Sequence, residues 1–155
     1  MQNTHMHDVL RQLHEAVIDV VGVFNRPQND AILLREAGVT LDRALFPLLV
    51  LTQRRGPIAV GDLADRVGRD YTTVSRQMAK LESLGLVARR SGKTDRRVTE
   101  AVVTDRGQAM SEVLDAARER LAGIALAGWS ERDLKNLARL LRRFADNLMR
   151  GTEDP

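Results

Sequence analysis

The chain contains no cysteine and only three histidines, and these absences exclude several kinds of chemistry. Without cysteine there is no disulfide scaffold, no thiol redox sensor and no cysteine-ligated zinc or iron–sulfur site. No phosphate-cradling glycine loop is present, and so few histidines leave no nucleophile triad to assemble. His7 and His14 share one predicted helical face with His5 nearby, but a polar N-terminus explains them better than a zinc site. We therefore expect no enzyme, no cofactor and no metal.

Long apolar runs are missing as well. No stretch approaches the roughly 18 residues that a membrane span requires. The N-terminus lacks the basic patch and apolar stretch of a signal peptide. The 155 residues, 43% hydrophobic and 29% charged, fit one compact domain or a small module within an oligomerising scaffold. We expect a cytoplasmic protein with no membrane partner.

The net charge of +3 is unevenly distributed along the chain. Residues 53–97 hold eleven lysines and arginines against five acids, a net of +6, while the rest carries −3. A basic middle between slightly acidic ends suggests that one part of the chain meets a polyanion. Charge alone fits a solvated, salt-bridged surface equally well.

Apolar periodicity predicts a mostly helical chain. A first helix spans 5–24, a break follows at 26–30, and the helix resumes over 31–36. Thr40 is a suitable cap for a second helix, in which Pro47 predicts a kink or a late start because proline lacks a backbone donor. Two short helices at 60–67 and 71–84 follow.

After Gly85 the period changes to that of strands. Segments 86–90 and 99–103 read as a β-hairpin whose tip, 91–98, is polar and basic. Thr104 then caps a long helix, and Ser130 caps a last helix with a clean apolar stripe. The expected fold is mainly α with a small β-hairpin wing.

Two short helices, a tight turn and a hairpin together make a winged helix-turn-helix. The second short helix buries Val74, Met78 and Leu81, and its other face is small, polar and basic, as a major groove requires. The hairpin tip carries long cations that suit a minor groove or phosphates. Each face alone is better explained as the wet side of an amphipathic element, and the ordered combination reverses that judgement. The predicted DNA-binding residues are Arg54, Tyr71, Thr72, Thr73, Ser75, Arg76, Gln77, Lys80, Lys93, Asp95, Arg96 and Arg97.

The chain resembles the MarR family of bacterial transcription regulators over nearly its whole length. The most specific match is Asp95-x-Arg97 followed by Val103-Thr104-x-x-Gly107, with Val103 in place of the family's leucine. Further matching segments are 60–64, 73–76, 81–82 and 85–87. The resemblance implies a dimer in which first and last helices interlock. It also implies that Arg97 enters the minor groove and that Asp95 orients it by a salt bridge.

Three departures from the family pattern carry consequences. Tyr71 stands where a smaller or charged residue is usual, and it either stacks on a sugar, alters base preference or merely packs. Pro47 could reshape the cleft in which relatives hold small phenolic or aromatic ligands, for which Phe24 and Phe46 are the candidates here. The absence of cysteine excludes the peroxide-sensing branch.

The sequence thus predicts a sequence-specific DNA-binding regulator: a homodimeric repressor on a palindromic operator in double-stranded DNA, released by a small aromatic effector if one exists. Residues 1–36 and 105–150 would form a helical dimerisation region, 40–104 the winged helix-turn-helix domain and 151–155 a disordered tail. The alternative is a winged-helix module that contacts protein and has lost DNA binding. Positive charge on both the helix and the wing favours DNA.

Overall fold

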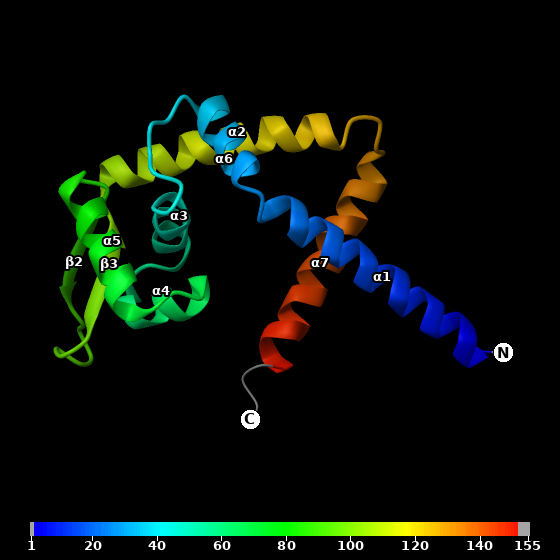
Figure 1. Ribbon diagram of the computed structural model, residues 1–155, viewed down its shortest axis with the longest axis horizontal. Coiled ribbons are helices and arrows are strands. Elements are labelled where there is room, and N and C mark those ends of the chain that lie inside the picture. The colour runs from blue at the N-terminus through cyan, green and yellow to red at the C-terminus, as the bar shows by residue number, and fades with distance from the viewer. Residues whose placement is uncertain (1, 152–155) are drawn as a thin grey trace. The chain divides into compact units, whose positions relative to one another are not determined.

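The computed structural model describes residues 2–151, with side chains from residue 4 onward, and it is mostly helical. The chain forms two compact units, residues 1–119 and residues 120–155. Among the described residues, no helix is long and apolar enough to cross a membrane. The elements in chain order are α1 (Gln2–Phe24), α2 (Pro27–Ala37), α3 (Phe46–Arg55), β1 (Ile58–Ala59), α4 (Val60–Val67), α5 (Tyr71–Ser83), β2 (Val87–Ser91), β3 (Thr99–Val103), α6 (Asp105–Ala125) and α7 (Glu131–Gly151) (Figure 1).

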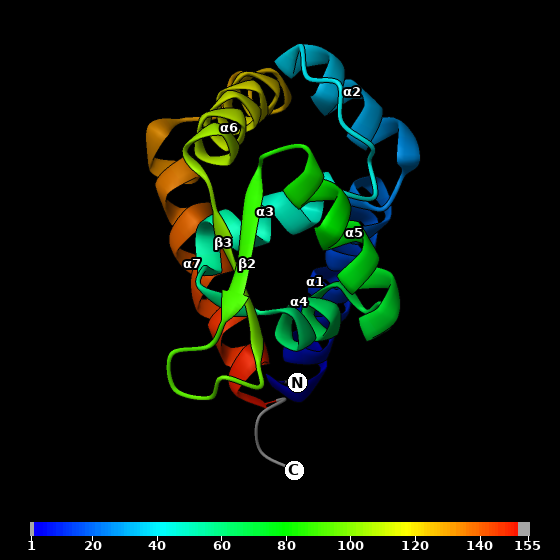
Figure 2. The same cartoon turned by 90° about the vertical axis from the view of Figure 1, so that its left-hand side faces the viewer.

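The first unit contains a closed core between α3, α4, α5, the small sheet and the first turns of α6. We call this group of elements the winged-helix lobe (Figure 2). Apolar side chains from every helix of the group are fully shielded from solvent, which is the close packing expected of a folded interior. They include Leu48, Leu49, Leu63, Val74, Met78, Leu81 and Leu114.

The sheet has three antiparallel strands in the order β1-β3-β2. Strands β2 and β3 form the predicted hairpin, with Val87 opposite Val103 and Ser91 opposite Thr99. The sequence did not predict β1, whose two residues pair with Ala101 and Glu100. Two residues are too few to show an alternating pattern, so only pairing with a partner strand defines β1.

The predicted start of α3 at Thr40 is wrong. The helix begins at Phe46 with Pro47 in its first turn, where a missing backbone donor costs nothing and the fixed φ of proline suits a helix start. Ahead of it, the Asp42 carboxylate accepts the Ala44 N–H at 2.7 Å, which closes a tight turn. The late start, one of the two effects expected of Pro47, is therefore what the structure shows.

Proline also moves the start of α2. The sequence places a break at 26–30, but the helix begins at Pro27 and continues to Ala37. It ends at Gly38, whose φ of 64° lies in the left-handed region that favours glycine. One side chain of α2, Leu33, is buried.

The start of α6 is fixed by two residues of the wing motif. The Thr104 hydroxyl accepts the Gly107 N–H at 3.1 Å and donates to the Gly85 carbonyl at 2.6 Å, so the predicted cap is confirmed. A Cβ on Gly107 would lie 1.9 Å from the Leu86 carbonyl oxygen, and only glycine fits there. Leu114 and Ala117, further along α6, are completely shielded from solvent.

The second unit consists chiefly of α7. Its predicted cap is confirmed, since Ser130 Oγ accepts the Asp133 N–H at 3.1 Å. No residue of α7 is buried, and Leu137, Leu140, Leu141 and Leu148 are all exposed. Gly151, placed by the sequence in a disordered tail, is the last residue of α7, and residues 152–155 lie outside the described part of the chain. The division into dimerisation and winged-helix regions stays a prediction.

Candidate nucleic-acid interface

The helix-turn-helix is formed by α4, a three-residue turn and α5. Gly68 ends α4 with a φ of 65°, and the N–H of Arg69 returns to the Ala64 carbonyl at 3.1 Å. This left-handed glycine ending reverses the chain within three residues. The predicted limits of α4 are therefore confirmed, and α5 follows directly.

Asp70 caps the N-terminus of α5. Its carboxylate accepts the Thr73 N–H at 2.9 Å and the Thr73 hydroxyl at 2.6 Å. These bonds, the hydroxyl's first, hold the pKa of Asp70 below its usual value. The bond from the Thr73 hydroxyl to Asp70 also uses the only hydrogen of that hydroxyl. With this cap in place, Thr73 can offer DNA its oxygen as an acceptor and its methyl group, but no donor.

The face of α5 opposite its buried side chains is the candidate reading surface. Val74, Met78 and Leu81 face the core and are completely shielded from solvent. The predicted contact residues divide into two groups by exposure. Tyr71, Thr72, Arg76 and Lys80 are exposed, whereas Thr73, Ser75 and Gln77 are partly buried on the flanks of the helix.

The wing presents Arg97 on a fixed support. Asp95 accepts the Arg97 backbone N–H at 3.0 Å, Nε at 3.2 Å and Nη2 at 3.3 Å. The Arg97 side chain, first, and its backbone N–H lower the pKa of Asp95. The Arg97 side chain stays 91% exposed despite this bridge. The salt bridge implied by the family resemblance is therefore present, and it aims a largely exposed cation into solvent.

The tip around Arg97 is a tight turn. Gly92 donates to the Val98 carbonyl at 2.8 Å, and Val98 donates to the Asp95 carbonyl at 3.1 Å. A Cβ on Gly92 would lie 2.6 Å from the Asp95 carbonyl oxygen, so a side chain there would displace the turn. The other predicted wing cations, Lys93 and Arg96, are exposed.

Glu82 and Arg89 join the wing to α5. Glu82 accepts the backbone N–H of Arg89 at 2.8 Å and its Nη2 at 3.3 Å, and Arg89 Nη1 also reaches the Ser75 carbonyl at 3.5 Å. The Arg89 backbone N–H, chiefly, lowers the pKa of Glu82. Sequence reasoning gave neither residue a role, because their pairing joins two elements. The one sequence signal for this pairing was that Leu81-Glu82 forms part of the family motif.

Some predicted residues lie away from the surface formed by α5 and the wing tip. Arg54, near the end of α3, forms an ion pair with Asp115 of α6 at 3.5 Å. The two ligand candidates differ in their surroundings, since Phe24 is 65% exposed on α1 whereas Phe46 is buried. The assignment of these two side chains to a ligand site stays a prediction.

Comparison with known proteins decides the family. The model of the MarR family matches residues 41–99. The HTH-type transcriptional regulator YdgJ of Bacillus subtilis (strain 168) is 31% identical over 113 residues, which cover 73% of this chain and 69% of YdgJ. The chain belongs to the MarR family of transcriptional regulators. The expectation drawn from the wing motif is thereby confirmed.

One further sequence relative and one solved structure are similar to this chain. The HTH-type transcriptional repressor MdtR of Bacillus subtilis (strain 168) is 28% identical over 112 residues, covering 72% of this chain and 71% of MdtR. A protein from Listeria monocytogenes assigned to the MarR family, crystallised with a 26mer DNA, superposes with a TM-score of 0.63 at 23% identity. The superposition covers 88% of this chain and 87% of the Listeria chain. The winged helix fold of this MarR family member is thus shared with a solved structure.

Proposed function

We propose that this MarR family member binds a palindromic operator in double-stranded DNA as a homodimer and represses transcription. Helix α5 would lie in the major groove, with Thr72, Arg76 and Lys80 facing the bases and phosphates. The observation that carries the proposal is Arg97, a cation braced by Asp95 yet 91% exposed at the end of a wing that contacts α5. A protein-binding face would not require positive charge in both places.

The dimer is supported by the terminal helices. Along α1, Val9, Leu10, Leu13 and Val20 are exposed, as are four leucines of α7, at positions 137, 140, 141 and 148. Monomeric proteins rarely expose apolar stripes of this length, and a second copy of the chain would cover both. The repressor role is supported by the relative MdtR, a transcriptional repressor.

A two-fold dimer makes a geometric demand on the operator. Two copies of α5 that enter successive major grooves on one face of the duplex must lie about 34–36 Å apart, which corresponds to half-sites one helical turn apart. The test is selection of bound duplexes from a random pool with purified protein. We expect enrichment of a symmetric site whose affinity falls steeply with salt. Recovery of no preferred duplex, or binding insensitive to salt, would favour the protein-interaction module instead.

A small aromatic effector stays a prediction for this chain. By linkage, such a ligand would bind free protein more tightly than the operator complex, by the same factor by which it weakens DNA binding. Calorimetry on both forms tests each compound. Equal affinity for the two forms would exclude that compound as an inducer.

A further inference from the structure

Arg69, in the turn between α4 and α5, makes two hydrogen bonds from a single nitrogen. Its Nη1 donates to the Ala44 carbonyl at 2.7 Å and to the Gln77 side-chain oxygen at 2.9 Å. Arginine is only a donor, so the Gln77 atom that faces it must be the amide oxygen. Both acceptors are neutral, and hydrogen bonds with a charged donor are stronger than neutral ones.

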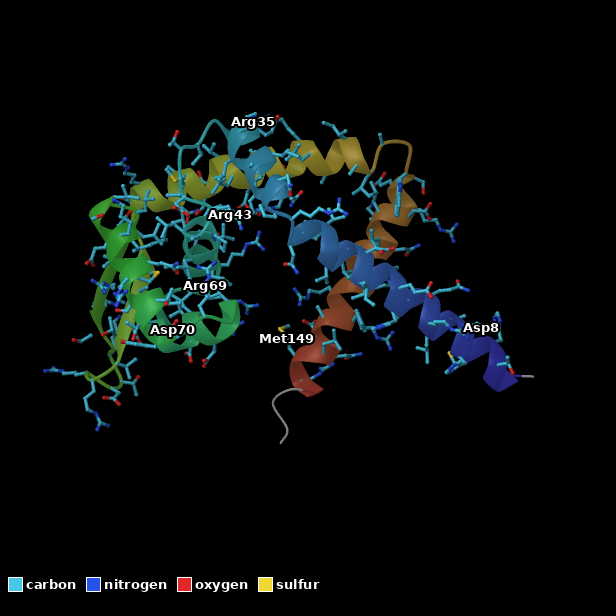
Figure 3. All side chains as sticks on the ribbon, in the orientation of Figure 1. Asp8, Arg35, Arg43, Arg69, Asp70 and Met149 are labelled. Carbon is cyan, nitrogen blue, oxygen red and sulfur yellow. The ribbon has the colours of Figure 1, made fainter. Side chains whose placement is uncertain are left out.

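The two acceptors belong to different parts of the lobe. Gln77 is on α5, whereas Ala44 lies in the turn before α3, which Asp42 holds closed through the Ala44 N–H. The neighbouring Arg43 is 3.9 Å from the Asp30 carboxylate of α2. Arg43, Arg69 and Asp70 are labelled in Figure 3. Arg69 thus ties the recognition helix to the connection between α2 and α3.

The position of Gln77 on α5 gives this tie its consequence. Gln77 is partly buried and follows the exposed Arg76, while the next residue, Met78, is completely shielded. A bond at this flank resists rotation of α5 about its own axis. Such a rotation would move the exposed face of the helix away from base edges, where contacts require close geometry.

We propose that Arg69 is a positioning residue, which holds α5 at the angle its exposed face needs to read DNA without itself contacting DNA. The proposal rests on the proposed DNA-binding function. It differs from a phosphate contact in one measurable way. Loss of a phosphate contact weakens all duplexes and lowers the salt slope by about one. Loss of positioning weakens only the duplex that is read in detail.

The first test compares Arg69→Met with wild type on the selected operator and on a random duplex of equal length, across a salt series. We expect operator affinity to fall about tenfold, the size of a lost base contact, with less than a twofold change on random DNA and an unchanged slope. Arg66→Met, which removes an exposed arginine of α4, is the matched control for lost charge. Equal losses on both duplexes with a reduced slope would make Arg69 a phosphate contact and overturn the proposal.

The second test does not depend on DNA binding. Gln77→Met removes only the bond to α5 and leaves the bond to Ala44, so this variant remains informative if Arg69→Met folds poorly. Hydrogen exchange should be faster in α5 of either variant than in wild type or Arg66→Met, because an anchor of the helix is lost. Unchanged exchange in α5 would overturn the proposal. Wild-type protein that enriches no duplex would instead contradict the proposed function, and exchange would still decide the role of Arg69.

Discussion

The winged-helix lobe and the terminal helices differ in whether their apolar side chains are buried within one chain. In the lobe, Val74 and Met78 are completely shielded from solvent by elements of the same chain. In α7, Leu140 is 49% and Leu141 55% exposed, and no residue of this helix is buried. Helix α5 of the lobe and helix α7 both carry apolar residues at helical spacing, so the sequence pattern alone does not distinguish the two helices.

What distinguishes the two regions is where the covering surface comes from. Helix α5 packs on α4 and β2 within the lobe, so its hydrophobic contribution is complete in one chain. The leucines on the apolar stripe of α7 are exposed, and in the proposed dimer a second copy of the chain would cover them. The stability of the lobe should therefore be independent of protein concentration, whereas the order of the terminal helices should depend on it.

The largest effect should come from the uncovered helix. In the proposed dimer, Leu141→Asp should favour the monomer, because a buried leucine contributes about 1.5 to 3 kcal/mol and a symmetric interface loses it twice. The expected loss is about 3 to 6 kcal/mol per dimer. Light scattering at micromolar concentration measures the change. Arg139→Glu, on the polar face of the same helix, should leave the dimer intact. A wild-type chain that is a stable folded monomer would refute the interface.

The stability of the winged-helix lobe should instead be sensitive to substitutions that leave a cavity in its core. Met78→Ala should destabilise the lobe by about 2 to 5 kcal/mol, since its side chain is fully buried and the site cannot collapse completely. Urea unfolding gives the change in free energy. The matched control is Leu140→Ala, which should cost far less in dilute, monomeric protein. Equal costs for the two substitutions would remove the contrast between the regions.

A smaller effect is expected at the reading surface of the lobe. Arg76→Ala should weaken operator binding by about 1 to 3 kcal/mol and relax discrimination at one base position, because arginine can pair bidentately with guanine. Titration of operator and random duplexes by fluorescence anisotropy measures both affinities.

Lys93→Ala is the comparison for Arg76→Ala. It should weaken all duplexes about equally and lower the salt slope by about one if Lys93 contacts one phosphate. Identical behaviour of the two variants would mean that α5 is not the element that reads the bases.

The smallest effect concerns pH. The bonds from Arg97 and Thr73 lower the pKa values of Asp95 and Asp70. A depressed pKa in the folded state contributes stability that is present above the unfolded value, near 4, and is lost as pH falls through the folded value. The wing bridge and the α5 cap should therefore persist from pH 7 to below 4. Titration of the carboxyl carbons by NMR checks this, with Asp95→Asn to assign the signal. An Asp95 pKa at or above its usual value would contradict the bridge.

The sequence predicted elements best where local chemistry sets their ends. The end of α4 follows from Gly68, and the start of α6 follows from Thr104, which caps it. Helix α3 was placed too early because its apolar pattern extends upstream through Leu41 and Leu45. The turn closed by Asp42 and the constraint of Pro47 override that pattern. Strand β1 exists only through its pairing with β3 and leaves no local trace.

The candidate site follows the same division. The exposed face of α5 and the cations of the wing could be predicted because spacing alone places them. The bonds that fix their geometry could not, since Arg69 reaches back 25 residues to Ala44 and Glu82 reaches forward seven to Arg89. The assignment of Arg54 to DNA, made from its charge, stays a prediction, and the structure adds an ion pair with Asp115 that the sequence did not predict. Position along the chain does not reveal such long-range partners.

The buried residues of α6 have a consequence for exchanging DNA-reading modules between MarR relatives. Leu114 and Ala117 are completely shielded from solvent although they lie ten or more residues beyond the end of the wing. A chimaera joined at residue 104 would therefore combine the DNA-reading module of one protein with the buried α6 side chains of another. A junction after Ala117 would transfer the module together with these buried side chains. The chimaera should then have the operator preference of the protein that donated the module.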